Sequence, residues 1–498
     1  MSNIRVTYSG LISLTGGIIS IFTGIIFTLI ITRSVTPEEY GTWGLIVGLI
    51  TYVSLIGPIV SYWSTRDTAR NIQSGKTAIL SSILLSIGAI SIYILISYLM
   101  GNYTNVERNV LLFAAILIPT MFVNGILIAI NLGWKPHAIS YGTLAYGISS
   151  IPLALFLIYY LDFGVTGIII SVFLANIASI IILFFYAKEK ITNQFDKKIL
   201  KKWLKFSWLP IYPGIAILVA GFDISIFTII TGSVVGLAFW VAALVLPGMI
   251  THTGLISRAV YAKLLEEKTG FMSQNLTLVF YFGIVFTSLV ITFARPGLYA
   301  LNPIYEIAAP VTIILSFYVF LSVFTNIFLL SLAGVERVDK FENSTFKDYI
   351  KSKLFFPQTI RLIQTSIYVL ILTVGLLILV GFGSSDQELL LFWASIALVT
   401  QIPLVCILYY FVRKSITIKI EISRIAKFSL TAIGAFGLTH VLTTQFLVYS
   451  PDIVSFIPNV LMFASFGVGL YIIITYLIDN KIRNLVHAVI YEIKTKKS

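Results

Sequence analysis

Fourteen long apolar segments constrain this chain more than any other feature of its sequence. Each covers about 20 residues or more, and none contains a lysine or an arginine. A segment of that length crosses the roughly 30 Å hydrocarbon core of a bilayer as one helix. The segments are 9–32, 41–63, 77–100, 110–132, 139–161, 165–187, 207–231, 233–254, 271–294, 307–333, 362–383, 389–411, 428–449 and 454–478. The sequence therefore predicts an all-α polytopic membrane protein with about fourteen transmembrane helices.

The composition excludes a soluble protein. Hydrophobic residues make up 58% of the chain and charged residues only 11%, with a mean hydropathy of +0.96. The first apolar segment is too long for the core of a signal peptide and lacks a small-residue cleavage site, so we expect it to be retained. The single cysteine, Cys406, excludes intrachain disulfides and is expected to be a small buried hydrophobic residue.

The net charge of +13 is an orientation signal rather than a nucleic-acid surface. If the N-terminus is cytoplasmic, only Arg33, Arg108 and Arg295 of the 34 basic residues fall in external loops. Lysine and arginine concentrate on the cytoplasmic side of membrane proteins. We therefore expect a multi-pass protein of the cell membrane with both termini in the cytoplasm.

The connections between the segments divide the chain into two halves of six. Weak sequence similarity between the halves supports a repeat, because Tyr40-Gly41 opens the second segment and Val235-Gly236 opens the eighth. Two such lobes related by an axis along the membrane normal would enclose a central cavity, with the last two spans as peripheral helices. The predicted parts are an N-lobe over 1–187, a basic cytoplasmic linker over 188–206, a C-lobe over 207–411 with a cytoplasmic insert at 334–361, and a final part over 412–498 with two spans and a basic tail.

The linker has the pattern of a helix on a membrane surface. At helical spacing its basic residues share one face and its apolar residues the other. The basic face holds Lys197, Lys198, Lys201, Lys202 and Lys205, and the apolar face holds Phe195, Ile199, Trp203 and Phe206.

Asp223 is the one carboxylate deep within a predicted span. A charge at that depth costs about 3 kcal/mol even on a lenient scale, so it is a functional candidate. It would need a wet cavity or a cation, and Na⁺ or H⁺ are the candidate coupling ions, with neutral oxygen ligands from Gln364, Thr365 and Ser366. The alternative is a carboxylate that hydrogen-bonds a helix break at Pro213 and Gly221.

Amides in the fourth span form a second candidate group. Asn124 and Asn131 either line an aqueous cavity or serve as hydrogen-bonding contacts between helices.

Catalytic patterns are absent from the sequence. The four histidines follow no ligand spacing, and no nucleophile-elbow, phosphate-loop or zinc-protease motif occurs. The best catalytic candidate in an external loop is the pair Glu38-Glu39, whose alternative role is a solvated start of a loop. We expect a protein that is not an enzyme and that has no catalytic residues, no metal site and no organic cofactor.

Three stretches resemble the Wzx-type polysaccharide-biosynthesis flippases of the multidrug/oligosaccharidyl-lipid/polysaccharide exporter superfamily. The first is TRSVTPEEYGTWGLIVGLI, in which the similarity is carried by Arg33, Pro37, Glu38, Glu39, Tyr40 and Gly41. The others are GFDISIFTIITGSVVGLAFWVAALV, which contains Asp223, and the stretch from Leu301 to Arg337. The family often has an arginine at the inner end of the second span, where Arg66 is displaced, and a proline where this chain has Ala262.

The resemblance implies translocation of a polyprenyl-(di)phosphate-linked sugar or oligosaccharide from the inner to the outer leaflet by alternating access. Implied partners are that lipid, the membrane and proteins of glycan assembly, with no nucleic acid. Candidate contacts to the phosphate are Arg66, Arg70, Lys135 and Arg258, which are alternatively orientation charges.

Three other functions compete with translocation of a glycolipid. Drug antiporters of the same superfamily carry a carboxylate in span one, and the first span here has none. A membrane glycosyltransferase or polymerase is disfavoured because the external loops are short. A non-transporting scaffold for glycan assembly is the third alternative.

Overall fold

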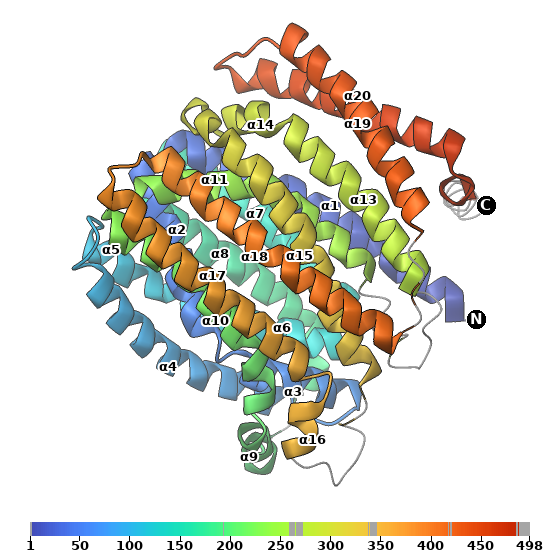
Figure 1. Ribbon diagram of the computed structural model, residues 1–498. Coiled ribbons are helices and arrows are strands. Elements are labelled where there is room, and N and C mark those ends of the chain that lie inside the picture. Colours follow the sequence, from blue (N-terminus) through green and yellow to red (C-terminus); the bar gives the residue numbers. More distant parts are fainter. Residues whose placement is uncertain are drawn as a thin grey trace. The chain divides into compact units, whose positions relative to one another are not determined.

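The secondary structure is helical throughout the part of the chain that the computed structural model describes (Figure 1). The described residues are 2–192, 194–257, 272–336, 346–416 and 421–484, with 264, 338, 418 and 487. Twelve helices in these ranges are long and apolar enough to cross a membrane, and a bent pair, α2 (Pro37–Ser54) with α3 (Pro58–Ala69), makes a thirteenth span. In α1 (Ser2–Ser34) a shorter apolar stretch, Ile19–Ser34, is described. The predicted all-α membrane fold is confirmed.

Internal contacts divide the chain into two compact units. The first joins Met1–Ala242 to Glu336–Leu404, and the second joins Ala243–Val335 to Val405–Ser498. The first unit also contains α4 (Gly75–Met100), α5 (Arg108–Phe113), α6 (Leu117–Trp134), α7 (His137–Ala154), α8 (Gly164–Ala187), α9 (Lys197–Lys205), α10 (Trp208–Thr231), α16 (Phe346–Lys351) and α17 (Phe356–Gly381). The second contains α13 (Met272–Thr292), α14 (Ala294–Leu301), α15 (Ala309–Val335), α19 (Ile422–Phe446) and α20 (Ile453–Ile478). Two helices, α11 (Val235–Gly248) and α18 (Asp386–Ser415), continue from one unit into the other, and the predicted lobe boundaries stay predictions.

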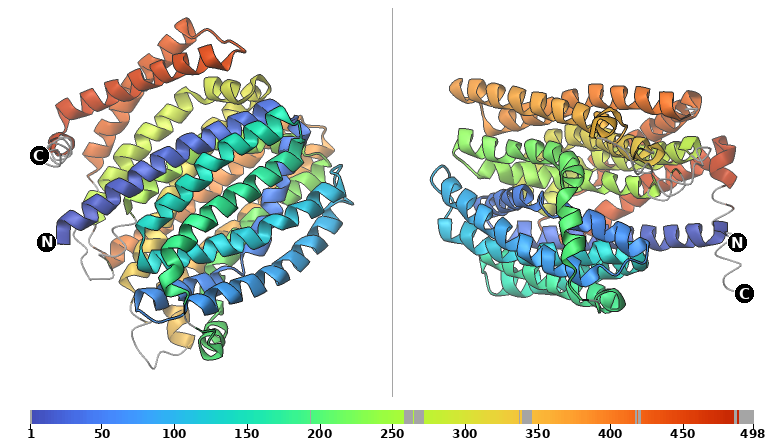
Figure 2. Two further views of the ribbon diagram at one scale, coloured as in Figure 1. Left: turned by 180° about the vertical axis from the view of Figure 1, so that it is seen from behind. Right: turned by 90° about the horizontal axis from the view of Figure 1, so that it is seen from below.

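The first unit is built from long helices packed side by side. In Figure 2, α1 runs along α7, and α7 in turn packs against α8. Figure 1 shows α10 beside α17, which are distant in the sequence but in contact. The second predicted span is not one straight helix, because it bends by 62° between α2 and α3. The bend falls where Pro58, which has no backbone N–H to donate, starts the new helix.

The predicted surface helix forms, and part of its apolar face packs against protein: Trp203 is buried, whereas Phe195 and Phe206 are exposed. In α9 the Asp196 side chain caps the start by accepting from the backbone N–H of Lys198 at 2.7 Å. The indole of Trp203 is fully buried, and its Nε1 donates to Asp67 Oδ2 on α3 at 3.0 Å. The sequence pattern could not separate burial in lipid from burial against protein, and here Trp203 packs against protein.

The predicted insert contacts α10 through an aromatic pair. Phe355 stacks on Tyr212 of α10 with ring centroids 4.0 Å apart. Residues 337 and 339–345 of the insert lie outside the described residues.

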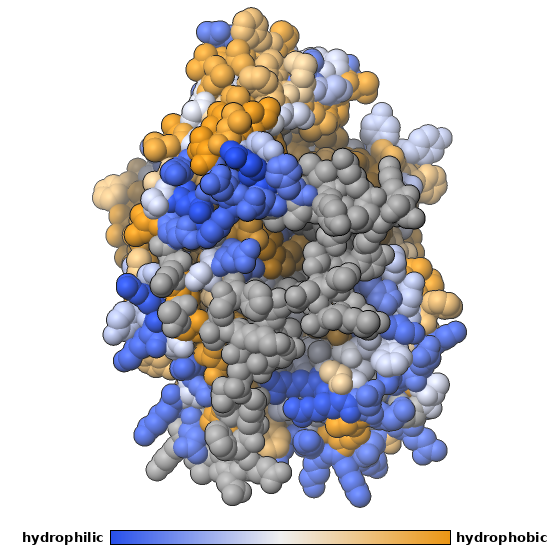
Figure 3. Space-filling model, turned by 90° about the vertical axis from the view of Figure 1, so that its right-hand side faces the viewer, coloured by the Kyte–Doolittle hydropathy of each residue, from blue (hydrophilic) through white to orange (hydrophobic). Residues whose placement is uncertain are grey.

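The last two spans belong to the second unit and expose much apolar surface. Side chains such as Leu430, Ile433 and Val454 are more than two-thirds exposed, and the upper part of Figure 3, where α19 and α20 lie, is largely orange. Where the start of α19 meets the end of α20, Arg424 Nε donates to Asp479 Oδ2 at 2.6 Å. Cys406 on α18 is exposed, so the expectation of a buried cysteine is wrong.

Candidate functional site

The stretch that carries the family resemblance starts a helix. Thr36 caps α2, because its Oγ1 accepts from the backbone N–H of Glu39 at 3.3 Å, while Glu39 Oε2 accepts from the backbone N–H of Thr36 at 2.9 Å. Pro37 occupies the first position of the helix, where its missing N–H costs nothing. Arg33 lies in the last turn of α1, just before this cap. Glu39 therefore has a structural role as the partner in a capping box, and Glu38 lies beside it in the first turn.

Gly41 follows the cap and permits close approach of two segments. Its neighbour Tyr40 is buried, and a Cβ placed on Gly41 would lie 1.9 Å from the carbonyl oxygen of Val234. Two further glycines continue the same face of α2, with Gly44 against Val241 and Gly48 against Ile224. The first helical turns of α2 thus pack directly on α10 and the start of α11.

Asp223 on α10 accepts hydrogen bonds from a tyrosine hydroxyl and a backbone N–H. Tyr368 of α17 donates its hydroxyl to Asp223 Oδ2 at 2.7 Å, and the backbone N–H of Ile224 donates to Oδ1 at 2.7 Å. Trp393 of α18 donates its Nε1 to the Tyr368 hydroxyl oxygen, also at 2.7 Å. Trp393 is fully buried and stacks on Trp240 at 3.8 Å. Asp223, Tyr368 and Trp393 therefore form a hydrogen-bonded chain between three helices.

The oxygen ligands expected around Asp223 bond elsewhere. Gln364 donates to Thr400 Oγ1 at 3.2 Å, Thr365 donates to the carbonyl of Arg361, and Ser366 donates to the carbonyl of Leu362 at 2.9 Å. A hard cation such as Na⁺ takes several oxygen lone pairs, whereas the groups facing this carboxylate present hydrogens. Among the described residues no cluster of three or more His, Cys, Asp or Glu side chains forms a metal site. None of these three hydrogen bonds links the expected ligands to Asp223.

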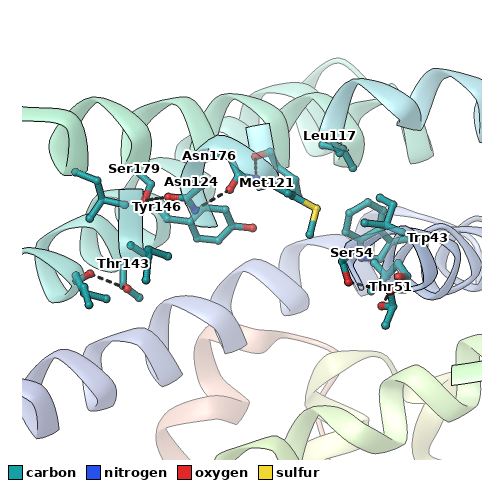
Figure 4. A pocket seen from close by; sticks show the side chains of 16 residues that line it. Trp43, Thr51, Ser54, Leu117, Met121, Asn124, Thr143, Tyr146, Asn176 and Ser179 are labelled. Carbon is teal, nitrogen blue, oxygen red and sulfur yellow. Dashed lines mark hydrogen bonds between the residues drawn. The ribbon is translucent and has the colours of Figure 1, made fainter. Parts of the chain in front are cut away.

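A pocket of about 390 Å³ lies among α2, α6, α7 and α8 (Figure 4). Every residue lining it is neutral. They are Trp43, Val47, Ile50, Thr51, Ser54, Leu117, Met121, Asn124, Ile128, Ile139, Thr143, Tyr146, Val172, Asn176, Ser179 and Leu183. The pocket thus combines an apolar wall with a few amides and hydroxyls, as small-molecule sites do.

Asn124 is the centre of the polar part of the pocket. Its Nδ2 donates to Asn176 Oδ1 at 3.3 Å, and its Oδ1 accepts from Ser179 Oγ at 3.1 Å. Asn176 is in turn fixed to α8 by donating to the carbonyl of Val172 at 2.9 Å. Each amide nitrogen has two hydrogens, so one on each of Asn124 and Asn176 is left for a ligand.

Asn131, the other predicted amide, does not line the pocket. It is fully buried, and its Nδ2 donates to the carbonyls of Leu127 and Leu183, each at 2.9 Å. This side chain ties α6 to α8, which is the helix-contact alternative.

The predicted phosphate contacts lie at helix ends outside the pocket lining. Arg66 lies in the last turn of α3 with its guanidinium 4.7 Å from the ring centre of Tyr62, and Arg70 follows as the cap. Lys135 caps α6 and pairs with Glu189 at 3.2 Å. Arg258 lies outside the described residues.

Sequence reasoning missed the partners of both polar groups. Tyr368, the residue that contacts Asp223, lies one helical turn after the predicted ligand Gln364 on the same face of α17. Asn176 and Ser179 also share one face of a helix, a signal that the sequence contained. Trp393 and Tyr146 carried no signal, because an aromatic residue in an apolar span is ordinary.

Comparisons with known proteins find similarity of structure alone. No protein-family model and no curated protein matches the sequence. A multidrug resistance MATE family transporter of the MOP superfamily, in an inward-facing conformation, gives a TM-score of 0.57 at 14% identity over 81% of this chain and 98% of that chain. The lipid II flippase MurJ, in an inward closed conformation, gives 0.56 at 15% identity over 96% of this chain and 100% of that chain.

A third structure comes from the same superfamily. A MOP superfamily transporter from Pyrococcus furiosus gives a TM-score of 0.53 at 14% identity over 82% of this chain and 95% of that chain. All three solved structures are membrane transporters or flippases rather than enzymes. The chain therefore has the fold of the MOP superfamily transporters and of the lipid II flippase MurJ.

Proposed function

We propose that this protein moves a polyprenyl-(di)phosphate-linked sugar or oligosaccharide from the inner to the outer leaflet, and that it belongs to the Wzx-type flippases. The fold supports transport, and the similarity to a lipid II flippase over nearly the whole chain supports a lipid-linked cargo. The observation that carries the proposal is the neutral pocket among α2, α6, α7 and α8.

The lining of that pocket distinguishes the candidate cargoes. A cation that leaves water loses its hydration, which a carboxylate best replaces, and no carboxylate lines the pocket. A sugar is uncharged and needs hydroxyls and amides to replace water hydrogen bonds, which this lining supplies. The lipid tail stays in the bilayer, so only the head group requires a cavity.

The charged part of the cargo would bind at the basic helix ends. Arg66 and Arg70 end α3, and Lys135 ends α6, which packs against α3. Arginine and lysine both bind phosphate oxygens, arginine with two parallel hydrogen bonds. We assign the phosphate contact to these three residues and keep Arg258 as a fourth candidate.

The proposed function is tested by export in cells. Deletion of the gene in its native host should remove the lipid-linked glycan from the outer leaflet and let it accumulate inside, as measured by surface labelling of the glycan and by mass spectrometry of extracted lipids. Reintroduction of the gene should restore both. Unchanged surface glycan, together with a lost efflux of a cationic dye from the same cells, would instead assign the protein to the drug antiporters.

The orientation rests on the distribution of basic residues. We propose that both termini face the cytoplasm, with the loop before α18 and the loop before α20 outside. In a Cys406→Ala background, Ser384→Cys and Ser450→Cys should react with an impermeant thiol reagent in intact cells, whereas Lys198→Cys on α9 should react only after lysis. Labelling of Lys198→Cys in intact cells contradicts this orientation.

Asp223 is the proposed point of ion coupling. We take H⁺ as the coupled ion, because a single carboxylate can bind a proton without other ligands, whereas Na⁺ needs several oxygen ligands around it. Protonation removes the charge that the Tyr368 hydroxyl stabilises and so loosens the contact of α10 with α17. Export should then depend on a proton gradient in the parent protein and lose that dependence in Asp223→Asn. Dependence on Na⁺ alone would refute proton coupling.

A further inference from the structure

The pocket contains a hydroxyl that has no partner among the described residues. Tyr146 of α7 lines the pocket, and within the described part of the chain nothing is hydrogen-bonded to its hydroxyl. In Figure 4 its ring reaches into the middle of the pocket, and the hydroxyl points toward the side where Met121 and Trp43 lie. A phenolic hydroxyl in apolar surroundings costs free energy unless a ligand or water bonds to it.

Two amides and two threonine hydroxyls line the same pocket. Asn124 and Asn176 each have a spare amide hydrogen beyond the bonds that fix them to each other and to α8. Thr143 and Thr51 use their hydroxyl hydrogens within their own helices, at 2.9 Å to the carbonyls of Ile139 and Val47, which leaves oxygen lone pairs for a ligand. The lining therefore offers both donors and acceptors, and it offers no charge.

We propose that this pocket is a subsite for the uncharged sugar part of the cargo, separate from the contact that holds the phosphate. The inference rests on the proposed function and adds to it the individual groups that would bind the sugar, the Tyr146 hydroxyl among them. Hydroxyl groups of a sugar both donate and accept, which matches the mixed lining, and the Trp43 and Tyr146 rings offer apolar faces to the C–H groups of a sugar ring. An ion of either sign would find no opposite charge in the lining.

The distance along α6 between Asn124 and Lys135 agrees with separate sites for the sugar and the phosphate of the head group. Asn124 and Lys135 are on the same helix, and at 1.5 Å per residue their backbone positions are about 16 Å apart along its axis. The phosphate bound near Lys135 and a sugar bound near Asn124 would thus lie at two levels of one helix. A substrate with more than a single ring between its phosphate and its far end fits that separation.

The test is photocrosslinking in the native host. A benzoylphenylalanine residue in place of Met121, inside the pocket, should capture a lipid-linked sugar, detected as an adduct that contains both sugar and phosphate by mass spectrometry. The same residue in place of Leu132, which is exposed on the same helix and outside the pocket lining, should capture phospholipid only. A sugar-free adduct at Met121, no adduct there, or equal sugar adducts at both positions would overturn the subsite.

Matched variants distinguish the loss of the Tyr146 hydroxyl from a loss of folding. Tyr146→Phe should lower the sugar adduct at least fivefold, and Asn124→Leu should lower it further. Tyr141→Phe, on the same helix and outside the pocket lining, should leave it unchanged. Because Tyr146→Phe keeps the ring, an unchanged adduct in that variant counts against the subsite even if Asn124→Leu does not fold. Export measured in parallel separates the two proposals: normal export without a sugar adduct removes the subsite alone, and absent gene-dependent export removes both.

Discussion

The two faces of α2 differ in how they use side chains. One face carries Gly41, Gly44 and Gly48, and there the helix contacts α10 and the start of α11 closely enough that a methyl group would collide. The other carries Trp43, Val47 and Thr51, and there the helix borders the pocket. The glycines thus allow close helix contact on one face. On the other face, uncharged side chains line the pocket.

The tight face continues toward the buried carboxylate. Below the glycines, Tyr52 donates its hydroxyl to the carbonyl of Gly221 at 2.7 Å and lies 2.7 Å from Ser225 Oγ. Gly221 and Ser225 each lie two residues from Asp223, and a helix turns about 200° over two residues. So α10 presents one face to α2 and the opposite face, with Asp223, to Tyr368 of α17. A change at Asp223 that moves α10 would therefore be felt by α2 and by the pocket behind it.

The largest effect is expected at the tightest glycine. Gly41→Val places a branched side chain against a backbone oxygen that cannot rotate away, since even a Cβ would lie 1.9 Å from the Val234 carbonyl. We expect a loss of about 3 kcal/mol or a separation of α2 from α11. Thermal unfolding in detergent measures the loss, and thiol labelling of Ser233→Cys in a Cys406→Ala background reports the separation.

A glycine in open surroundings is the control for that variant. Gly88 on α4 has nothing within 4 Å of a built Cβ, so Gly88→Val should cost much less. Equal destabilisation by the two variants would show that loss of glycine itself, rather than the close contact, is responsible.

The next largest effect is expected at Tyr368, the residue of α17 that contacts Asp223 on α10. Tyr368→Phe removes the hydroxyl between Asp223 and Trp393, which leaves the half-buried carboxylate short of one donor and the fully buried indole N–H without its acceptor. An unsatisfied buried group costs about 1–3 kcal/mol, so we expect about 2 kcal/mol in thermal unfolding. A double-mutant cycle with Asp223→Asn should give a coupling energy well above zero. Strictly additive effects would mean that the hydrogen bond contributes nothing.

The sequence predicts the spans well because each one depends only on its own composition. It does not predict the site, because the site depends on contacts between distant residues. Asn124 and Asn176 are 52 positions apart, and Asp223 and Tyr368 are 145 positions apart. The sequence did identify Asp223 and Asn124, since a polar side chain in an apolar span is visible by itself. Tyr368, the partner of Asp223, and Tyr146, which lines the pocket with Asn124, are common residues in such spans, and only their placement gives them a role.

A smaller effect is expected where α2 meets α10 through a single hydroxyl. Tyr52→Phe removes the hydrogen bond to the Gly221 carbonyl and keeps the ring that contacts Phe222 edge-on at 5.3 Å. A neutral hydrogen bond contributes about 1 kcal/mol, so the unfolding midpoint should fall by less than in Tyr368→Phe. If Tyr52→Phe destabilised more than Tyr368→Phe, the α2 contact rather than the Asp223 network would be the stronger link of α10.

The smallest effect on stability is expected on the open face. Thr51→Val replaces a hydroxyl by a methyl group of similar size, and that hydroxyl bonds only to the carbonyl of Val47 in its own helix. Since that carbonyl keeps its helical position, stability should change by no more than about 0.5 kcal/mol. Export of the glycan, measured by surface labelling, should nevertheless fall two- to threefold, because the pocket loses one acceptor for a sugar hydroxyl. The opposite pattern, normal export with a clear loss of stability, would mean that this face of α2 packs against protein like the glycine face and does not border a binding pocket.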